Sequence, residues 1–485
     1  MEVIIFMMRL PSYMMYLIFV INFILSITIV VLERKQPEKT LAWLLVLALV
    51  PPVGLFLYIF LGRNWKIHKL NDERFSNQVQ DLISPVLKEI KDKTYISLIE
   101  LLANNSDSPV FLNNDITVFK DGIQKFKRLK EELLKAKHHI HLEYYIVKSD
   151  TIGNEIKEIL IKKSLEGVRV RFIIDRVGAA KMKRSYIREL RSAGIDVVLY
   201  SYFLSPLLKL INTQINYRNH RKIAIIDGKV GFLGGINIGD EYLGNSKLGY
   251  WRDTHIMVKG DFVLGLQAVF LDDFMTIQQA NNYYSFYDQE FDQYFPTTNV
   301  ESPLAMQLVK SGPDSEFPAI MQGMLKMITM ATDRIYITTP YFVPTESIMD
   351  ALRISALGGV NIKIIFPERA DHIMVNKASR TYLGELMRCG VKVYFYDKSS
   401  FVHAKTITID GKISSVGTAN MDIRSFDLNY EINTVIYSEH ISQQLDQLFL
   451  EDLKNCREFS LEEYENADKL TKVIEGVARI FSSLL

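Results

Sequence analysis

Two long apolar stretches lie near the N-terminal end of the sequence. The first runs from Tyr13 to Leu32 and the second from Leu41 to Leu61, and a short polar segment separates them. About 20 consecutive apolar residues are enough for a helix to cross the hydrocarbon core of a bilayer. The pattern therefore predicts a two-helix transmembrane hairpin within residues 1–66, with spans at about 13–32 and 41–61.

Two other interpretations of these stretches can be weighed against the hairpin. A cleaved signal peptide is disfavoured, because no small-residue cleavage site follows the first stretch and a second apolar stretch comes at once. A buried pair of helices in a soluble domain is the remaining alternative. Pro51 and Pro52 predict a kink in the second helix. Basic residues on the two sides of the hairpin are nearly balanced and favour a cytoplasmic catalytic region only weakly.

Hydrophobic strands separated by helical segments occur twice in the rest of the chain. Runs rich in β-branched residues, bounded by glycine and separated by helical patterns, indicate αβ units with a parallel or mixed sheet. We therefore predict an α/β fold in which two duplicated halves, 110–300 and 301–485, pack about a pseudo-twofold axis. An amphipathic linker at 67–109 precedes them. The matching strands are 140–146 with 335–339, 167–174 with 359–366, and 194–200 with 390–396.

Charge and cysteine content narrow the functional classes. The 485 residues include 57 basic and 56 acidic ones, which gives a formal net charge of +1. This balance argues against a broad channel for nucleic acid, which would show as an excess of basic residues. Cys389 and Cys456 are too few for a disulfide framework, so a reducing compartment is favoured. No cysteine–histidine cluster has the spacing of a zinc site, and no cofactor is expected.

The most specific signal lies late in each half. A histidine is followed by lysine two positions later, aspartate seven positions later and asparagine seventeen positions later, with the same offsets in both halves. One copy of this pattern would be weak evidence, whereas two copies with matched offsets indicate a duplicated active site. The two sets are His220, Lys222, Asp227 and Asn237 in the first half, and His403, Lys405, Asp410 and Asn420 in the second.

The residue types in this motif suit the chemistry of a phosphodiester. Histidine and lysine two apart on a strand point to the same face, and a twofold packing of the halves would bring both pairs to one seam. One neutral histidine attacks phosphorus while the other, protonated, donates to the leaving oxygen. Lys222 and Lys405 would neutralise the non-bridging oxygens. Asn237 and Asn420 would add hydrogen bonds to the phosphate, and no metal is required.

Four carboxylates accompany the two histidines. Asp253 and Glu431 lie downstream of the motifs at comparable distances, and we expect them to orient the catalytic histidines. Asp227 and Asp410 belong to the catalytic motif, but a carboxylate beside a phosphate is repulsive, so we expect a structural role for them. The other histidines are expected to be surface or core residues: His68, His138, His139, His141, His255, His372 and His440.

The two motifs resemble the paired HKD motifs of the phospholipase D superfamily. More narrowly, the chain is similar to the bacterial cardiolipin synthases, and the likeness covers nearly its whole length. The resemblance implies two phospholipase D-like halves that follow a transmembrane hairpin. Besides the motifs, the segments that carry the likeness are Pro51–Gly54, Gly62–Arg63, Trp251–Thr254, Asn420–Phe426 and Ala478–Leu485.

The resemblance also implies a two-step transfer. His220 would attack one phosphatidylglycerol to form a phosphatidyl-histidine, while His403 would protonate the released glycerol. His403 would then deprotonate a hydroxyl of a second phosphatidylglycerol, and the product would be cardiolipin. The sequence leaves open which histidine is the nucleophile, because both copies match almost equally well. The expected partners are phosphatidylglycerol and membrane lipid rather than nucleic acid, and the expected location is the inner membrane of a bacterial cell.

Two further apolar segments lie outside the motifs. Residues 203–211 are expected either to enter the membrane interface or line an acyl groove, or else to form a buried helix. Near the C-terminal end, apolar residues recur at helical spacing from Leu470 to Leu484, and core packing is favoured there over membrane contact.

Three alternatives to cardiolipin synthesis follow from the same residues. A phospholipase D, or another phosphatidyltransferase, would begin with the same intermediate but use water or a different alcohol as acceptor. A nuclease built on these motifs is disfavoured by the hairpin and the balanced charge. A catalytically silent scaffold is disfavoured because histidine, lysine and asparagine are intact in both halves.

Overall fold

The computed structural model describes residues 12–31, 37–50, 53–54, 58, 95–200, 217–280 and 291–482. The chain divides into two units, one made of Met1–Ile67 with Tyr202–Asn216 and the other of His68–Ser201 with Tyr217–Leu485. Three features expected from the sequence lie outside the described residues. They are the kink at Pro51 and Pro52, most of the linker at 67–109, and the apolar segment at 203–211.

The smaller unit contains two apolar helices, α2 (Ser12–Val31) and α3 (Pro37–Leu49). Asn22 donates a hydrogen bond of 3.3 Å from its side-chain amide to the carbonyl oxygen of Leu47, which joins the two helices. Trp43 packs edge-on against Tyr58 with ring centroids 5.4 Å apart. Helix α2 coincides with the first expected span, and α3 covers the start of the second. Among the described residues, no helix has both the length and the apolar character needed to cross a membrane.

The first half of the larger unit is built on a mixed sheet of eight strands in the order β15-β9-β8-β7-β3-β4-β5, with β2 paired to β9. Strands β3, β4 and β5 are parallel, whereas β7 runs antiparallel to β3, β8 to β7, and β9 to β8. The bounds are β2 (Asn114–Asp121), β3 (His139–Tyr144), β4 (Arg169–Asp175), β5 (Asp196–Tyr200), β7 (Lys222–Ile226), β8 (Val230–Gly234) and β9 (Tyr250–Gly260).

The second half repeats this arrangement on a sheet of ten strands in the order β1-β10-β19-β17-β16-β11-β13-β14-β20, with β6 paired to β19. Strands β11, β13 and β14 are again parallel, whereas β16 runs antiparallel to β11, β17 to β16, and β19 to β17. The bounds are β1 (Val110–Phe111), β10 (Ala305–Ser311), β11 (Arg334–Thr338), β13 (Asn361–Pro367), β14 (Lys392–Tyr396), β16 (Thr406–Ile409), β17 (Ile413–Gly417), β19 (Asn429–Tyr437) and β20 (Cys456–Phe459).

The predicted duplication is therefore confirmed, and the predicted strand pairs correspond to β3 with β11, β4 with β13, and β5 with β14. Two short strands also pair across the halves. Strand β6 (Arg218–Asn219) of the first half runs parallel to β19 of the second, and β15 (Ser400–Val402) of the second runs parallel to β9 of the first. These two crossings come directly before His220 and His403, so each motif begins on the other half's sheet.

Helices cover both faces of the first sheet, because its central strand is buried on both sides. Along β3, Ile140 and Leu142 belong to the core, which also contains buried residues of α7 and α8. The alternate residues His139 and His141 face the other way, and Gln267 of α10 bonds to both. The helices of this half are α7 (Gly122–Lys135), α8 (Thr151–Leu165), α9 (Arg184–Ser192) and α10 (Phe262–Ala280).

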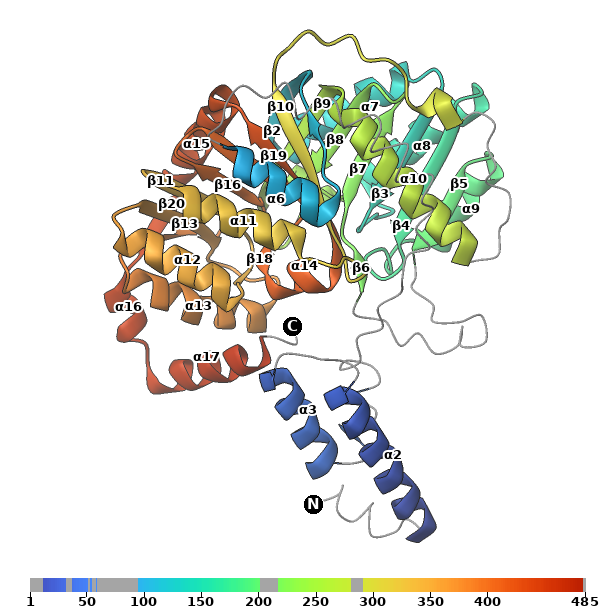
Figure 1. Cartoon of the computed structure of the whole chain (residues 1–485). Helices are drawn as coiled ribbons and strands as arrows, with labels where there is room; N and C mark the ends of the chain where they lie inside the picture. The colour runs from blue at the N-terminus through green and yellow to red at the C-terminus, as the bar shows by residue number, and fades with distance from the viewer. Residues whose placement is uncertain are drawn as a thin grey trace. The chain divides into compact units, whose positions relative to one another are not determined.

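The second half has helices on both faces of its sheet as well, with α11, α12 and α13 on the face toward the viewer (Figure 1). Its core includes Leu98 of α6 (Ile96–Ser106), a helix that precedes the first half in sequence. Gln307 fastens this segment by donating to the carbonyl oxygens of Ile99 and Ser108 at 3.1 and 2.8 Å. The helices are α11 (Ala319–Met330), α12 (Glu346–Leu357), α13 (Ile373–Met387), α14 (Ile423–Asp427), α15 (Glu439–Leu453), α16 (Leu461–Glu465) and α17 (Lys469–Phe481).

The C-terminal helix corrects one expectation from the sequence. Core packing was favoured for the apolar residues from Leu470 onward, but Leu470, Val473, Ile474 and Val477 are exposed in α17. The helical spacing was correctly identified, but this stripe faces away from the protein. Helical periodicity shows that apolar residues share a face and does not tell what that face contacts.

Candidate active site

The main chain of each motif histidine is held by the opposite half. His220 lies between β6 and β7, and its backbone amide donates a 2.9 Å hydrogen bond to the carbonyl oxygen of Tyr430 in β19. His403 lies between β15 and β16, and its backbone amide donates a 2.7 Å bond to the carbonyl oxygen of Arg252 in β9. Strand pairing thus places both histidines at the seam between the two sheets.

The side chain of each motif histidine also contacts the opposite half. Nδ1 of His220 lies 2.8 Å from Oε1 of Glu431, and Nδ1 of His403 lies 2.7 Å from Oδ2 of Asp253. Because a carboxylate accepts hydrogen bonds, the proton of each neutral imidazole resides on Nδ1, which leaves the lone pair on Nε2. The structure brings together the residues expected to form the two histidine–carboxylate pairs, with each carboxylate coming from the other half.

Both carboxylates are fully buried and are themselves positioned by hydrogen bonds. Thr418 donates from its hydroxyl to Oε2 of Glu431 at 2.6 Å, and Asn429 donates from its amide to Oε1 at 3.1 Å. The backbone amide of Thr254 donates to Oδ1 of Asp253 at 2.7 Å. Thr418 was not singled out as functional in the sequence, although it lies inside the repeated segment two residues before Asn420.

A buried ion pair joins the two halves beside the site. The spacing of the motif residues does not predict this pair. Nη2 of Arg252, the residue next to Asp253, lies 2.8 Å from Oδ2 of Asp452 on α15. Arg221 ion-pairs with Asp273 and also reaches the carbonyl oxygen of Glu431 at 3.4 Å. These contacts hold the strands that carry both carboxylates, so we assign them a positioning effect on the site.

The two motif lysines lie directly beside their histidines. Nζ of Lys222 donates to the carbonyl oxygen of His220, and Nζ of Lys405 donates to the carbonyl oxygen of His403. Nζ of Lys405 also lies 2.9 Å from Nδ1 and 3.0 Å from Nε2 of His403. Since Nδ1 donates to Asp253, Nε2 is the atom that accepts from this ammonium group.

Burial dominates the electrostatics of the cluster. It lowers the pKa of His220 and of His403 to about 4, so both imidazoles are neutral near pH 7. Burial also lowers the pKa of Lys222 to about 7 and that of Lys405 to about 8. For Glu431, burial raises the pKa, but His220 and Lys222 outweigh it and leave the pKa below its ordinary value. An anion bound here would stabilise the protonated forms of the lysines and histidines.

The two motif asparagines differ in their surroundings. Asn237 accepts from the backbone amide of Ile146 at 3.1 Å and donates to the hydroxyl of Tyr242 at 3.0 Å, so both ends of its amide are engaged. Asn420 is buried, and its Oδ1 has no hydrogen-bond partner within the described part of the chain. The unpaired atom of Asn420 is an acceptor, so this observation does not identify a donor for a phosphate oxygen.

The two motif aspartates lie at the far end of the strand from the histidines. Asp227 is five residues beyond Lys222, which corresponds to about 16 Å along a strand. Its carboxylate accepts from the backbone amides of residues 137, 138 and 139 at 2.9, 2.8 and 3.0 Å. Asp410 likewise accepts from the backbone amides of residues 332, 333 and 334, each at 2.9 Å. Both aspartates hold the turn that leads into the central strand of their half.

Glycines in the repeated segment allow a polar side chain of the neighbouring strand to approach in each half. A Cβ atom on Gly235 would lie 2.1 Å from Oδ1 of Asp253, and a Cβ on Gly417 would lie 2.1 Å from Oδ1 of Asn433. Real Cβ atoms do not come so close to another atom, so a larger side chain at Gly235 would displace Asp253. The role of Gly235 is therefore to make room for the carboxylate of Asp253, rather than to form a phosphate-binding loop.

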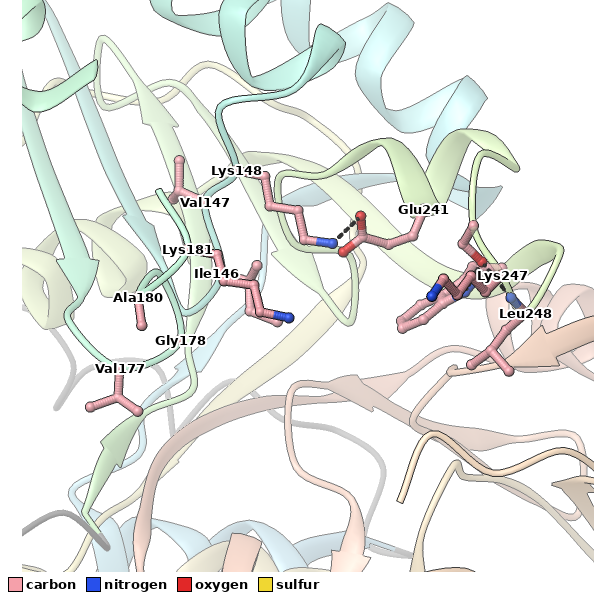
Figure 2. Close-up of a pocket in the computed structure, with 12 residues that line it drawn as sticks. Ile146, Val147, Lys148, Val177, Gly178, Ala180, Lys181, Glu241, Lys247 and Leu248 are labelled. Carbon is pink, nitrogen blue, oxygen red and sulfur yellow. Dashed lines mark hydrogen bonds and ion pairs between the residues drawn. The ribbon is translucent and has the colours of Figure 1, made fainter. Parts of the chain in front are cut away.

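Aromatic rings flank both imidazoles, and one of them borders a pocket. The ring of Tyr145 lies 4.9 Å from that of His220, and the ring of Trp251 lies 5.2 Å from that of His403, centroid to centroid. Trp251 also lines a pocket of ≈ 530 Å³ in the first half. Figure 2 is a close-up of this pocket. Lys148 stands at this pocket and pairs with Glu241 at 2.8 Å. The other lining residues are Ile146, Val147, Val177, Gly178, Ala180, Lys181, Ser246, Lys247 and Leu248.

Most other histidines lie away from the motifs. His139 and His141 are buried against Gln267 on the face of β3 that α10 covers. His255 is buried, whereas His372 and His440 are exposed. His68 lies outside the described residues.

Comparisons with known proteins agree with this architecture. The family described as "Cardiolipin synthase, PLD-like domain" matches residues 129–248 and 324–453, one stretch in each half. A second family, "Phospholipase_D-nuclease N-terminal", matches residues 20–63. The crystal structure of phosphatidylserine synthase from Haemophilus influenzae Rd KW20 has a TM-score of 0.61 to this chain at 14% identity. It covers 81% of this chain and 100% of its own, a likeness that concerns the fold alone.

Relatives of known function match over the full length. The major cardiolipin synthase ClsA of Bacillus subtilis (strain 168) is 40% identical over 493 residues, which cover 99% of this chain and 100% of that protein. The cardiolipin synthase of Oceanobacillus iheyensis is 40% identical over 501 residues with the same coverage. The duplicated fold and the sequence matches define an enzyme of the phospholipase D-like phosphatidyltransferase class. The chain belongs to the cardiolipin synthase family and is an enzyme of phospholipid synthesis, as the sequence predicted.

Proposed function

We propose that the chain joins two molecules of phosphatidylglycerol into cardiolipin and glycerol at the seam that holds His220 and His403. The observation that carries the proposal is the pair of crossed histidine–carboxylate contacts, 2.8 Å for His220 with Glu431 and 2.7 Å for His403 with Asp253. Two equivalent imidazoles, each oriented through Nδ1, suit a reaction that needs a nucleophile and a separate acid–base group.

In the first step, Nε2 of His220 attacks phosphorus. A P–N bond forms, the P–O bond to the head-group glycerol breaks, and protonated His403 gives its proton to the leaving oxygen. A bound phosphodiester favours this protonation because its negative charge opposes the effect of burial on the pKa of His403. Lys222 and Lys405 neutralise the non-bridging oxygens as charge develops there, and Asn420 adds a hydrogen bond.

In the second step, neutral His403 removes a proton from a hydroxyl of a second phosphatidylglycerol. The resulting oxygen attacks phosphorus, the P–N bond breaks, and His220 returns to its neutral form. The availability of the two Nε2 atoms supports this division of roles. Lys405 reaches Nε2 of His403 at 3.0 Å, whereas Nε2 of His220 has no hydrogen bond within the described part of the chain.

The pocket beside Trp251 supports a lipid substrate. Apolar side chains such as Val177 and Leu248 line it, and Lys181 and Lys247 bring positive charge, whereas Lys148 is paired with Glu241. We assign to it the glycerol backbone and the first acyl carbons of one phosphatidylglycerol. Ligand pockets typically combine an apolar lining with a few polar groups that orient the ligand, and this one adjoins His403 through the Trp251 ring.

The N-terminal unit is proposed as the membrane anchor. Helix α2 leaves Tyr16, Phe19 and Phe23 exposed, which suits contact with lipid. The proposed organisation is a hairpin at 1–66 with spans at about 13–32 and 41–61, a linker at 67–109, and phospholipase D-like halves at 110–300 and 301–485. This places the enzyme in the bacterial inner membrane as a multi-pass protein with the catalytic halves in the cytoplasm.

The test is incubation of the purified, detergent-solubilised protein with phosphatidylglycerol labelled in its head-group glycerol, in the presence of EDTA. We expect cardiolipin and free glycerol in equal amounts, lost in His220→Ala and in His403→Ala. His440→Ala, at an exposed position of α15, is the matched control and should keep full activity. Phosphatidic acid as the only lipid product would show that water is the acceptor and would overturn the proposal.

A further inference from the structure

The C-terminal helix α17 presents an apolar stripe to the outside of the second half. Its apolar residues recur at intervals of three and four positions, which places them on one face of a helix. Figure 1 shows α17 at the rim of this half, outside α13. The exposed fractions along the stripe are 69% for Leu470, 62% for Val473, 40% for Ile474, 44% for Val477 and 73% for Ile480.

The polar face of α17 is the face that docks on the protein. Glu475 is buried and accepts a 2.8 Å bond from Arg380 of α13. Arg479 pairs with Glu385, also on α13. Ser482, just beyond the helix, bonds to the hydroxyl of Tyr382 at 3.1 Å. A surface helix of a soluble domain ordinarily turns its apolar face inward and its charges to water, so this helix is attached in the reverse sense.

The size of the stripe bears on what covers it. Thirteen helical residues extend about 20 Å, and a helix is about 10 Å wide, so the face covers about 200 Å². A stable protein interface buries about 800 Å² on each partner, which is several times more. A helix that binds at a membrane interface can do so with its own apolar face alone. That face inserts about 5–10 Å into the boundary between headgroups and acyl chains.

Charges around the helix are mixed. Lys469 and Lys472 are exposed at its first turn, but Glu465 and Glu463 precede it, paired with Arg388 and Arg457 respectively. Attraction to anionic lipid is therefore a minor contribution, and apolar burial is the main one. Binding by this face should depend only weakly on salt.

We propose that α17 lies in the membrane interface with Leu470, Val473 and Ile480 in the lipid, as a second membrane contact separate from the N-terminal hairpin. The choice of a lipid bilayer as the partner rests on the proposed function, whose substrate and product are membrane lipids. The contact sets the second half, which carries His403, against the surface from which phosphatidylglycerol arrives. The reversed docking explains why Glu475 is buried against Arg380 of α13 while the aliphatic side chains are exposed.

The test uses the full chain in vesicles that contain phosphatidylglycerol. Cys389 and Cys456 are first replaced by serine, and a single cysteine is placed at Val473 or, as the control, at Leu165, which is 75% exposed on α8. Each cysteine carries a polarity-sensitive fluorophore, and nitroxide-labelled lipid is the quencher. We expect a blue-shifted emission and several-fold stronger quenching at Val473→Cys than at Leu165→Cys, little changed by salt.

Two results would overturn the proposal. One is quenching at Val473→Cys no greater than at Leu165→Cys, which would leave the stripe in water. The other is a blue shift at Val473→Cys that lipid nitroxide does not quench and that grows with the protein-to-lipid ratio, which would assign the face to a second copy of the chain. Neither readout needs turnover, so His220→Ala should give the same fluorescence even if the proposed reaction fails.

An activity comparison tests the consequence for the enzyme. Val473→Glu with Ile480→Glu should lower cardiolipin formation in vesicles several-fold relative to Leu165→Glu. The same variant should match the unmodified protein on phosphatidylglycerol dispersed in detergent micelles, because no residue of the site is changed. An equal loss in vesicles and in micelles would indicate a structural effect and contradict the proposal.

Discussion

Nδ1 of His220 lies 2.8 Å from Oε1 of Glu431, a residue 211 positions further along the chain. The mirror contact joins His403 to Asp253, 150 positions earlier. Each half therefore contributes a histidine and lysine to one pair and a carboxylate to the other. Neither half contains a complete histidine–carboxylate pair, because the pairing of β6 and β15 with the opposite sheets places each histidine beside the other half's carboxylate.

Glu431→Gln should lower the rate of cardiolipin formation by about 10²–10⁴-fold while the protein stays folded. The amide keeps the shape of the side chain but no longer stabilises the imidazolium or selects the tautomer with the proton on Nδ1. Glu462→Gln, at an exposed position of α16, is the matched control and should have no effect. A rate within threefold of the unmodified enzyme would show that Glu431 does not orient His220.

Asp227→Ala should reduce stability rather than the chemistry. The substitution leaves three backbone amides without their acceptor and places alanine at a φ of 54°, so we expect a loss of about 2–3 kcal/mol in the free energy of unfolding. Denaturant titration measures the loss, and activity per folded molecule should remain within about threefold. A fall of a hundredfold in that specific activity, without a change in stability, would make Asp227 a catalytic group.

Gly235→Ala should abolish activity, because the added methyl group displaces the carboxylate of Asp253. The added Cβ would lie 2.1 Å from Oδ1 of Asp253, so this side chain must move away from His403. Gly476→Ala is the matched control, since a Cβ there meets nothing within 4 Å. Rates of cardiolipin formation and thermal unfolding of both variants make the comparison, and full activity of Gly235→Ala would contradict the positioning of Asp253.

Stability should fall as the pH drops from about 6.5 to about 4. Burial lowers the pKa of both His220 and His403 to about 4 in the folded chain, whereas the unfolded chain titrates them near 6.5. Between these values the unfolded state binds more protons, so the free energy of unfolding falls as the pH is lowered. The loss reaches about 2 kcal/mol for each histidine at pH 5. His220→Gln with His403→Gln should show a shallower decrease between pH 7 and pH 5. An identical decrease in the double variant would contradict neutral, buried histidines.

The sequence was most informative where the chain repeats itself. The strands of both halves follow from β-branched runs that occur twice. The motifs stand out because the offsets of His220 and His403 to lysine, aspartate and asparagine are the same in both halves, which chance matches would not be. Charge, rather than spacing, supported a structural role for Asp227, because a carboxylate repels a phosphate. The contacts of Asp227 with the turn before β3 agree with that reasoning.

What the sequence left open depends on contacts between distant segments. No spacing rule indicates that Glu431 serves His220 rather than His403, because the crossing is created by the pairing of β6 with β19. No spacing rule identifies Thr418 either, because its role comes from the 2.6 Å hydrogen bond that it donates to Glu431. For α17 the sequence favoured core packing, which was wrong, because periodicity locates an apolar stripe without identifying what it faces. The ion pair of Glu475 with Arg380 decides which face of α17 docks on the protein.

The most direct test of the mechanism is the capture of its covalent intermediate. The unmodified enzyme, mixed with phosphatidylglycerol and quenched in base during turnover, where a phosphoramidate survives, should carry a phosphatidyl group on His220 in peptide mass spectra. His220→Ala should carry none. An adduct on His403 in the His220→Ala protein would exchange the roles of the two histidines. Absence of any adduct in a protein that still forms cardiolipin would contradict the covalent mechanism altogether.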